Sequence, residues 1–346
     1  MKNLISVGQR LIGDGQPCFI IAEIGSNHNQ DFDLAIEHID AAIDAGVDAV
    51  KFQTFKAESH VSKYAKMPSY LMEGESVQGL LQTLELNRSW QQPFQDYCNN
   101  KGIIFFSSPC DYDAVDSLEE IGVTAHKVAS FDLPDLDLIE YIAKTGKPII
   151  LSTGCADWMD IQRAVDTCRS AGNENVILLQ CTSLYPAPAE LSNLRAMTTM
   201  RSSFRTLTGY SDHTIGNTVP MAAVALGACM LEKHFTLSRK LPGPDHSFAI
   251  EPHELKDLVQ QIRLVEAAIG DGVKNGPRPE EMEMAEKVRR SLHASQDISK
   301  GERITVEMLC TKRPGSGISP FLRDQVIGRT AKRDILADEW ISWDMI

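Results

Sequence analysis

The sequence predicts an α/β protein whose main part is a closed (β/α)8 TIM barrel, followed by a small β-rich domain. Short apolar runs alternate with helix-like segments from residue 18 to about 268, and several segments end at glycine, a common helix stop. Eight such units fit a closed parallel barrel better than an open doubly wound sheet. A Gly-x-Gly-x-x-Gly pattern is missing after the first run, which also disfavours a dinucleotide-binding fold.

The apolar runs are the expected strands, and the segments between them have the spacing of helices. The expected strands are FIIAEI (19–24), DAVKFQ (48–53), IIFFSS (103–108), AHKVAS (125–130), PIILST (148–153), VILLQC (176–181), RTLTGY (205–210) and CMLEKHF (229–235). A polar insert, residues 54–78, follows the second strand. Inserts of this length are either mobile lids over a site or exposed excursions, and the sequence leaves both open.

The barrel is expected to occupy residues 1–270 and to be followed by a linker, 271–287, that is rich in Gly, Pro and charge. Residues 288–346 then form the small domain, which contains an internal repeat. Its segments 294–309 and 331–346 align without gaps and share five identities. Five identities in register favour duplicated halves over chance similarity, and duplicated halves predict a compact module with pseudo-twofold symmetry. The identities are Asp297/Asp334, Ile298/Ile335, Glu302/Glu339, Ile304/Ile341 and Met308/Met345.

Charge and cysteine content restrict the class of protein. The formal net charge is −13, so nucleic acid, which is bound by neutralising phosphates, is not an expected partner. No apolar segment is long enough to span a bilayer and the N-terminus lacks signal-peptide features, so we expect no membrane association and a cytoplasmic location. The eight cysteines form no Cys-x-x-Cys pair, which predicts free thiols of a reducing compartment.

Every expected strand carries polar or charged side chains at its C-terminal end. In barrels of this kind the active site lies at that end of the strands, so the pattern predicts an enzyme. The residues are Glu23, Lys51, Gln53, Ser107, Ser108, Lys127, Ser130, Ser152, Thr153, Cys181, Thr182, Ser183, Ser211, His213, Glu232 and His234.

His213 and His234 lie on the seventh and eighth strands, which are neighbours in a barrel. Two imidazoles with a nearby carboxylate suit a divalent transition metal such as Mn²⁺, with positions left for substrate. The alternative is a pair of hydrogen-bonded core histidines. His28, after the first strand, could join the pair or cap the next helix.

Lys51 and Lys127 end two other strands and predict an anion site, in which serine hydroxyls also bind phosphate or carboxylate oxygens. A buried pair between Lys51 and Glu23 is the alternative. A Schiff-base lysine needs no metal, so the histidine pair argues against it. The serines are Ser108, Ser130, Ser152 and Ser211.

Ten motifs, in order along nearly the whole chain, resemble the sialic acid synthase family, including its C-terminal antifreeze-like (SAF) domain. The motifs are AEIGSNHNQ, AGVDAVKFQTFKA, FFSSP, HKVAS, IILSTG, LLQCTSLYPAP, GYSDHTIGNTVPMAAVALGA, LEKHFTL, PGPDHSFAIEP and TKRPGSGISP. The resemblance implies condensation of phosphoenolpyruvate with an N-acyl mannosamine-type sugar and release of phosphate.

The resemblance also implies roles for individual residues. His213 and His234 would bind Mn²⁺, with Mg²⁺ or Co²⁺ as other candidates, and Glu23 and Asp245 would handle the protons and the attacking water. Arg313 would contact the acyl-sugar from the partner subunit of a domain-swapped homodimer; without the resemblance it is an ordinary surface arginine. Phosphoenolpyruvate would be held by Lys51, Ser108, Lys127, Ser130, Ser152, Ser183 and Ser211, and the sugar by Gln53, Tyr185 and Glu232.

Two departures affect the choice of sugar. The neuraminate synthases often carry Asn where this chain has Ser183 and Thr where it has Ser108. The PGPDH motif is closer to neuraminate and legionaminate synthases than to pseudaminate synthases. N-acetylneuraminate or legionaminate synthesis is therefore expected, with a pseudaminate or other deoxy-keto sugar acid synthase as one alternative and a non-catalytic sugar-binding protein as another.

Overall fold

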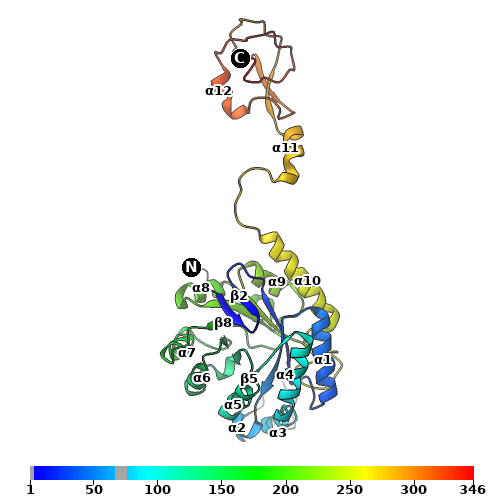
Figure 1. Ribbon diagram of the computed structural model, residues 1–346, viewed down its shortest axis with the longest axis vertical. Coiled ribbons are helices and arrows are strands. Elements are labelled where there is room, and N and C mark those ends of the chain that lie inside the picture. Colours follow the sequence, from blue (N-terminus) through cyan, green and yellow to red (C-terminus); the bar gives the residue numbers. More distant parts are fainter. Residues whose placement is uncertain (1–3, 67–75) are drawn as a thin grey trace. The chain divides into compact units, whose positions relative to one another are not determined.

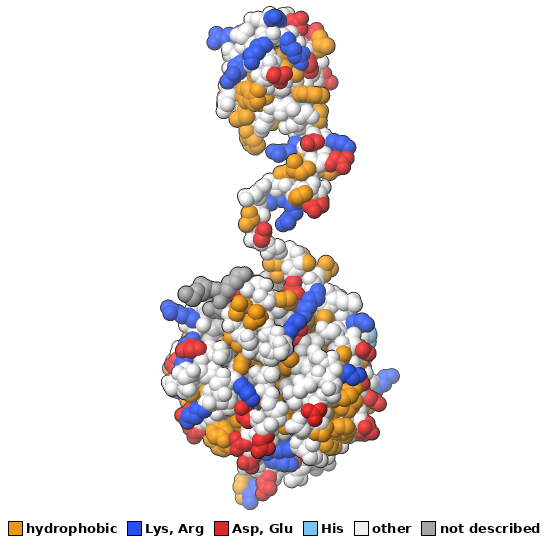
Figure 2. Space-filling view, in the orientation of Figure 1, with side chains coloured by type: hydrophobic (Ala, Val, Ile, Leu, Met, Phe, Trp, Pro, Cys, Tyr) orange, Lys and Arg blue, Asp and Glu red, His pale blue; other side chains and the backbone are white. Residues whose placement is uncertain are grey.

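The computed structural model describes residues 4–66 and 76–346, so part of the insert at 54–78 lies outside the described residues. The chain divides into two compact units, residues 1–270 and 271–346. Figure 1 shows the first unit as a set of strands surrounded by helices. Acidic and basic side chains are interspersed on the face of this unit that Figure 2 shows, and they do not gather into one basic patch there.

The first unit is a nearly closed barrel of eight parallel strands, as predicted. The strand order is β5-β4-β3-β10-β9-β8-β7-β6, and the two end strands, β5 and β6, pack side by side. Each expected strand is present within a few residues of its predicted bounds. The strands are β3 (Phe19–Gly25), β4 (Ala49–Thr54), β5 (Ile104–Pro109), β6 (His126–Val128), β7 (Ile149–Ser152), β8 (Val176–Cys181), β9 (Leu207–Asp212) and β10 (Met230–His234).

An outer layer of helices covers the barrel (Figure 1). Aspartates at several N-caps accept hydrogen bonds from the first turn, for example Asp31 from the Leu34 N–H, and so satisfy exposed donors. At the other end of the same helix Gly46 has a φ of 84°, which suits a residue without Cβ. The helices are α1 (Phe32–Ala45), α4 (Gln91–Lys101), α5 (Tyr112–Glu120), α6 (Leu136–Ala143), α7 (Trp158–Ser170), α8 (Arg195–Phe204), α9 (Thr218–Ala225) and α10 (Pro252–Ile269).

An N-terminal hairpin, which the sequence analysis did not predict, precedes the barrel. It consists of β1 (Leu4–Val7) and β2 (Arg10–Gly13), which pair antiparallel. Its buried side chains Ile5, Val7 and Ile12 join one apolar cluster with the inward-facing residues at the start of the strands, such as Phe19. The hairpin therefore closes the end of the barrel opposite to the carboxyl ends of the strands.

Short elements in the loops add to the barrel. The insert contains α2 (Ala57–His60), and α3 (Val77–Gln82) begins at its end. The 3-10 turns are η1 (Arg88–Trp90), η2 (Ser130–Asp132) and η3 (Ala189–Leu191).

The second unit has its own apolar core, which includes Ile298, Ile304, Ile335 and Ile341. Part of the expected linker is helical, as η4 (Pro279–Glu281) and α11 (Met282–Val288). The module itself contains β11 (Ser291–Ala294), β12 (Leu309–Lys312), η5 (Pro320–Leu322) and α12 (Arg323–Val326).

The internal repeat has the pseudo-twofold symmetry that the sequence predicts. Ile298 and Ile335 exchange both backbone hydrogen bonds, at 2.8 and 2.9 Å. The matched aspartates make matched contacts, because Asp297 accepts from the Ala337 N–H at 2.8 Å and Asp334 from the Lys300 N–H at 2.7 Å. Each half thus supplies the cap that the other half lacks, which explains why both copies keep the same residues.

All eight cysteines are free. Among the described residues, no helix combines the length and apolar character that a membrane span requires.

Candidate active site

The carboxyl ends of the barrel strands surround a cavity of about 260 Å³. The parallel register brings charged residues from adjacent strands side by side, for example Glu23 beside Lys51 and His234 beside Glu23. Among the strand-end polar residues to which the resemblance gives no role, Cys181 lines this cavity, whereas Ser107, Thr153 and Thr182 do not. All barrel residues to which the resemblance gives a role line it except Ser183. The lining residues among them are Glu23, Lys51, Gln53, Ser108, Lys127, Ser130, Ser152, Tyr185, Ser211, His213, Glu232, His234 and Asp245.

Two lysines and two glutamates form a buried charge network at the floor of the cavity. Lys51 Nζ lies 2.8 Å from Glu23 Oε2 and 3.9 Å from Glu232 Oε2. Lys127 Nζ lies 3.8 Å from Glu232 Oε1. The buried Lys51–Glu23 pair, which the sequence left as an alternative, is therefore present, within a larger network that also contains the Ser108 hydroxyl, 3.0 Å from Lys51.

The network makes Glu23 the carboxyl that exchanges a proton near neutral pH. Burial raises the pKa of Glu23 to about 7, although Lys51 opposes the shift. Burial acts in the same direction on Glu232, but Lys127 and Lys51 prevail and hold the pKa of that carboxyl below its usual range. Glu232 therefore remains the counter-ion of the lysines while Glu23 can gain or lose a proton.

Gly25 makes room for a hydrogen bond in this network. Gln53 Nε2 donates to Glu23 Oε1 at 2.7 Å. A Cβ on Gly25, whose φ is 57°, would lie 3.2 Å from both of these atoms. Gly25 was not predicted as a site residue, because nothing in the sequence distinguishes a glycine at a strand end from any other glycine.

His213 and His234 meet across β9 and β10, with ring centroids 5.3 Å apart. His213 Nδ1 lies 2.8 Å from the Thr182 carbonyl, so its N–H donates there and the Nε2 lone pair is left for a ligand. His234 Nδ1 is buried without a hydrogen bond and lies 3.5 Å from Asp245 Oδ2. A satisfied core histidine would not leave this atom unpaired, so the set fits a divalent metal better than a structural pair.

Burial also sets the protonation of two members of this group, His234 and Asp245. It lowers the pKa of His234 well below its usual value, which keeps the ring in the neutral form that a metal requires. It raises the pKa of Asp245 to about 6. Asp245 lies on a loop that is held in place by the next residue, His246. The Nδ1 atom of His246 lies 2.6 Å from Thr236 Oγ1.

The serines differ in how their hydroxyls are used. Ser211 donates to Glu232 Oε1 at 3.3 Å, and Ser130 accepts from the Gly154 N–H at 3.0 Å. Ser152 Oγ is buried and has no hydrogen-bond partner among the described residues. A buried hydroxyl left unpaired is costly, so Ser152 is available to a ligand oxygen.

Ser183 does not line the main cavity, and Arg313 belongs to the second unit. Ser183 lines a neighbouring cavity. A Cβ on Gly154 would lie 2.1 Å from Ser183 Oγ, so the absence of a side chain at Gly154 makes room for the Ser183 hydroxyl. Arg313 follows β12 in the second unit and is exposed.

His28 neither joins the histidine pair nor caps the next helix. Its Nδ1 accepts from the Gln30 N–H at 3.0 Å, and the cap of α1 is Asp31. The ring packs between Phe52 and Trp90, which fixes the turn after β3.

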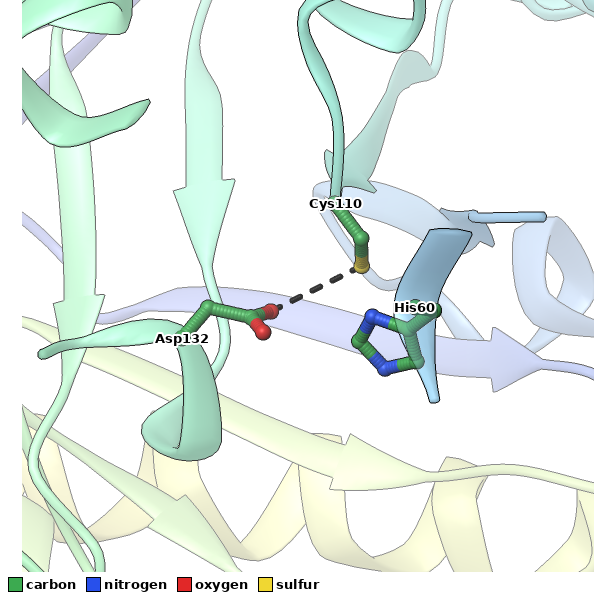
Figure 3. A group of neighbouring side chains, drawn as sticks. All are labelled: His60, Cys110 and Asp132. Atoms are coloured by element: carbon green, nitrogen blue, oxygen red, sulfur yellow. Dashed lines mark hydrogen bonds between the residues drawn. The ribbon is translucent and has the colours of Figure 1, made fainter. Parts of the chain in front are cut away.

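Two groups of lining residues were missed by the sequence analysis. One is an apolar wall formed by Phe55, Leu80, Leu81, Leu84 and Phe131. The other is the cluster His60, Cys110 and Asp132, which Figure 3 shows converging from three segments. Most of these residues come from loops and from the insert, where no periodic pattern indicates which side chains turn inward.

Comparisons with known proteins agree with the resemblance read from the motifs. Residues 38–274 match the NeuB family and residues 289–346 match the SAF domain. The N,N'-diacetyllegionaminic acid synthase of Campylobacter jejuni is 42% identical over 328 residues, which cover 93% of this chain and 98% of that protein. The enzyme of the same name from Legionella pneumophila is 38% identical over 342 residues, 96% of each chain.

A solved structure supports the same assignment. The N-acetylneuraminic acid (sialic acid) synthetase of Leptospira borgpetersenii has a TM-score of 0.75 and 36% identity, with 82% of this chain and 95% of that chain covered. The predicted resemblance and fold class are confirmed. The chain belongs to the NeuB family and carries a C-terminal SAF domain.

Proposed function

We propose that the protein condenses phosphoenolpyruvate with an N-acyl mannosamine-type sugar, giving a nine-carbon sialic acid-like sugar and phosphate. The observation that supports this most is the composition of the cavity. Two buried lysines face a metal-suited group of His213, His234 and Asp245 across one space of about 260 Å³. The names of the relatives point to the same class of reaction.

A divalent metal, with Mn²⁺ as the first candidate, would be held by His213 and His234 and would supply a Lewis acid for the sugar aldehyde. Asp245 lies 3.5 Å from His234 and could complete the ligand set or bind the attacking water.

The floor of the cavity would bind phosphoenolpyruvate. Lys51 and Lys127 neutralise its charge, and hydroxyls such as that of Ser152 bind its oxygens. Arrival of an anion beside Glu23 raises the pKa of that carboxyl above its value of about 7 in the free protein. Glu23 then takes up a proton and releases Lys51 to the substrate, which reconciles the buried pair with anion binding.

The reaction forms one carbon–carbon bond and, at carbon 2, forms one carbon–oxygen bond to water and breaks the one to phosphate. Carbon 3 of phosphoenolpyruvate attacks the aldehyde carbon, whose oxygen becomes a hydroxyl. Water adds to carbon 2, and the resulting adduct expels phosphate. In this proposal Glu23 and Asp245 transfer the protons, and Gln53, Tyr185 and Glu232 line the sugar site.

The apolar wall favours a trideoxy diacetamido sugar over N-acetylmannosamine. Its leucine and phenylalanine side chains can bury methyl groups, but they offer no partner to a hydroxyl at carbon 6. We therefore assign the protein to legionaminate-type rather than neuraminate synthesis. The proposal also includes a cytoplasmic location and a homodimer in which Arg313 of one subunit contacts the acyl-sugar in the barrel of the other.

The test is phosphate release from phosphoenolpyruvate with Mn²⁺, using N-acetylmannosamine or 2,4-diacetamido-2,4,6-trideoxymannose, each with and without chelator. Chelator-sensitive release with the second sugar supports the proposal, and release only with the first reassigns the substrate. A pseudaminate-type or other deoxy-keto sugar acid synthase, or a sugar-binding protein, would release none with either sugar.

A further inference from the structure

The rim of the cavity holds a second group of metal-ligating side chains. His60, Cys110 and Asp132 each offer one ligand atom, and these atoms lie within 4.8 Å of one another (Figure 3). His60 ends helix α2, Cys110 follows strand β5, and Asp132 ends the turn η2 after β6. None of the three has a role in the condensation proposed above.

The distance between Cys110 and Asp132 matches that of two ligands in a tetrahedral zinc site. Cys110 Sγ donates to Asp132 Oδ2 at a separation of 3.6 Å. Zinc binds a thiolate at about 2.3 Å and a carboxylate oxygen at about 2.0 Å, so two such ligands lie about 3.5 Å apart. The thiol proton therefore links the same two atoms that a bound ion would bridge.

The chemistry of the ligands distinguishes this group from the histidine pair. The difference is the thiolate of Cys110, because a soft sulfur ligand selects Zn²⁺ over Mg²⁺ and Mn²⁺. All three side chains are partly exposed and line the cavity, so an ion can reach them. Three protein ligands leave one position open to water.

An ion bound by this group would connect three segments that meet where the barrel strands β5 and β6 lie side by side. Strands β5 and β6 stand at the two ends of the strand order, and within the described residues no ladder of hydrogen bonds joins them. Cys110 and Asp132 follow these two strands, and His60 belongs to the insert after β4. An ion shared by the three would link the loops on both sides of this seam.

We propose that His60, Cys110 and Asp132 bind a zinc-class divalent ion at the cavity rim, separate from the ion expected at His213 and His234. Binding replaces the Cys110 thiol proton, which passes to solvent, and no oxidation or reduction occurs. The ion fastens α2 to the loops after β5 and β6. The inference stands independently of the proposed function.

The test is Co²⁺ titration of the metal-free, full-length protein. A thiolate ligand gives a near-ultraviolet sulfur-to-cobalt absorption, which we expect in the wild type and expect to be lost in Cys110→Ser. Cys155→Ser, at an exposed thiol outside the group, is the matched control and keeps the absorption. Circular dichroism and thermal melting of Cys110→Ser check that the loss is not a failure to fold.

His60→Gln provides a second variant on a short surface helix. It keeps the sulfur-to-cobalt absorption at saturation but weakens Co²⁺ binding by at least about 10-fold, the lower limit seen even for outer-shell changes. No absorption in the wild type, or absorption that persists in Cys110→Ser, overturns the proposal.

Zinc stoichiometry separates this site from the proposed catalytic one. Equilibrium dialysis should give two ions for the wild type and one each for Cys110→Ser and His213→Ala. A single wild-type ion that Cys110→Ser loses and His213→Ala keeps would support the rim site and refute the histidine pair. The converse would refute the rim site alone.

Discussion

Lys51 Nζ and Glu23 Oε2 lie 2.8 Å apart and are both almost fully buried at the floor of the cavity. Two buried charges are stable only when they are paired, so removal of either one leaves the other uncompensated. In this protein the pair also joins the proposed anion site, which contains Lys51, to the proposed proton acceptor, which is Glu23. The pair is therefore expected to serve both stability and turnover.

Replacement of Glu23 by glutamine should lower kcat/KM by about 10² to 10⁴, the usual contribution of a positioned acid or base. The glutamine keeps the volume of the side chain but cannot exchange a proton. Steady-state phosphate release measures the effect. Glu174→Gln, at an exposed surface pair with Arg169, is the control and should leave kcat/KM unchanged. Near wild-type turnover in Glu23→Gln would remove Glu23 from the mechanism.

The pH dependence of kcat/KM should show a group with a pKa of about 7. This parameter reports ionisations of the free enzyme, and burial raises the pKa of Glu23 to about 7 there. Because phosphoenolpyruvate binding is coupled to proton uptake by Glu23, the protonated form of the free enzyme is the one that binds, so kcat/KM should be level below about pH 6 and fall as pH rises through about 7. In Glu23→Gln this limb should disappear. A limb that survives the substitution belongs to another group, with Asp245, whose pKa is raised to about 6, as the first candidate.

Loss of either histidine of the pair should abolish tight Mn²⁺ binding. We expect His213→Ala and His234→Ala to weaken it by at least about 100-fold and to make phosphate release insensitive to added Mn²⁺. Isothermal titration and the electron paramagnetic resonance signal of free Mn²⁺ measure this directly. The exposed His253→Gln is the control. Unchanged Mn²⁺ affinity in both alanine variants would locate the metal elsewhere.

Ser152 and Ser107 form a matched pair of buried serines with opposite expected behaviour. Ser152 Oγ has no partner among the described residues, so Ser152→Ala should raise the free energy of unfolding by about 1 kcal/mol yet raise the KM for phosphoenolpyruvate about 10-fold. Ser107 Oγ lies 2.8 Å from Thr54 Oγ1, so Ser107→Ala should cost about 1 kcal/mol and leave that KM unchanged. Thermal melting and kinetics distinguish the two; the same response in both variants would refute the assignment of Ser152.

The proposed exchange of Arg313 between subunits can be tested by complementation. Arg313→Ala and Asp245→Asn should each be inactive alone. If the arginine acts on the partner's barrel, mixed dimers contain one intact site, and random mixing should restore about a quarter of wild-type activity. No recovery, despite subunit exchange shown by mass measurement, would mean that Arg313 acts within its own chain or not at all.

The barrel, its eight strands and the inward polar residues at their ends could be predicted from the amino-acid pattern alone. These features depend on local patterns: apolar runs, glycine stops, and side chains two apart on one face of a strand. The repeat of the SAF domain was also readable, because its two halves keep matched residues such as Asp297 and Asp334.

The folded structure was needed for every feature that depends on contacts between distant segments. It joined Lys51 to Glu23 and Glu232 in one network, directed Ser183 behind Gly154, and brought His60, Cys110 and Asp132 together at the rim. It also placed the N-terminal hairpin against the barrel core and His28 in a turn. None of these follows from periodicity, because loop side chains take their directions from packing and hydrogen bonding across the fold.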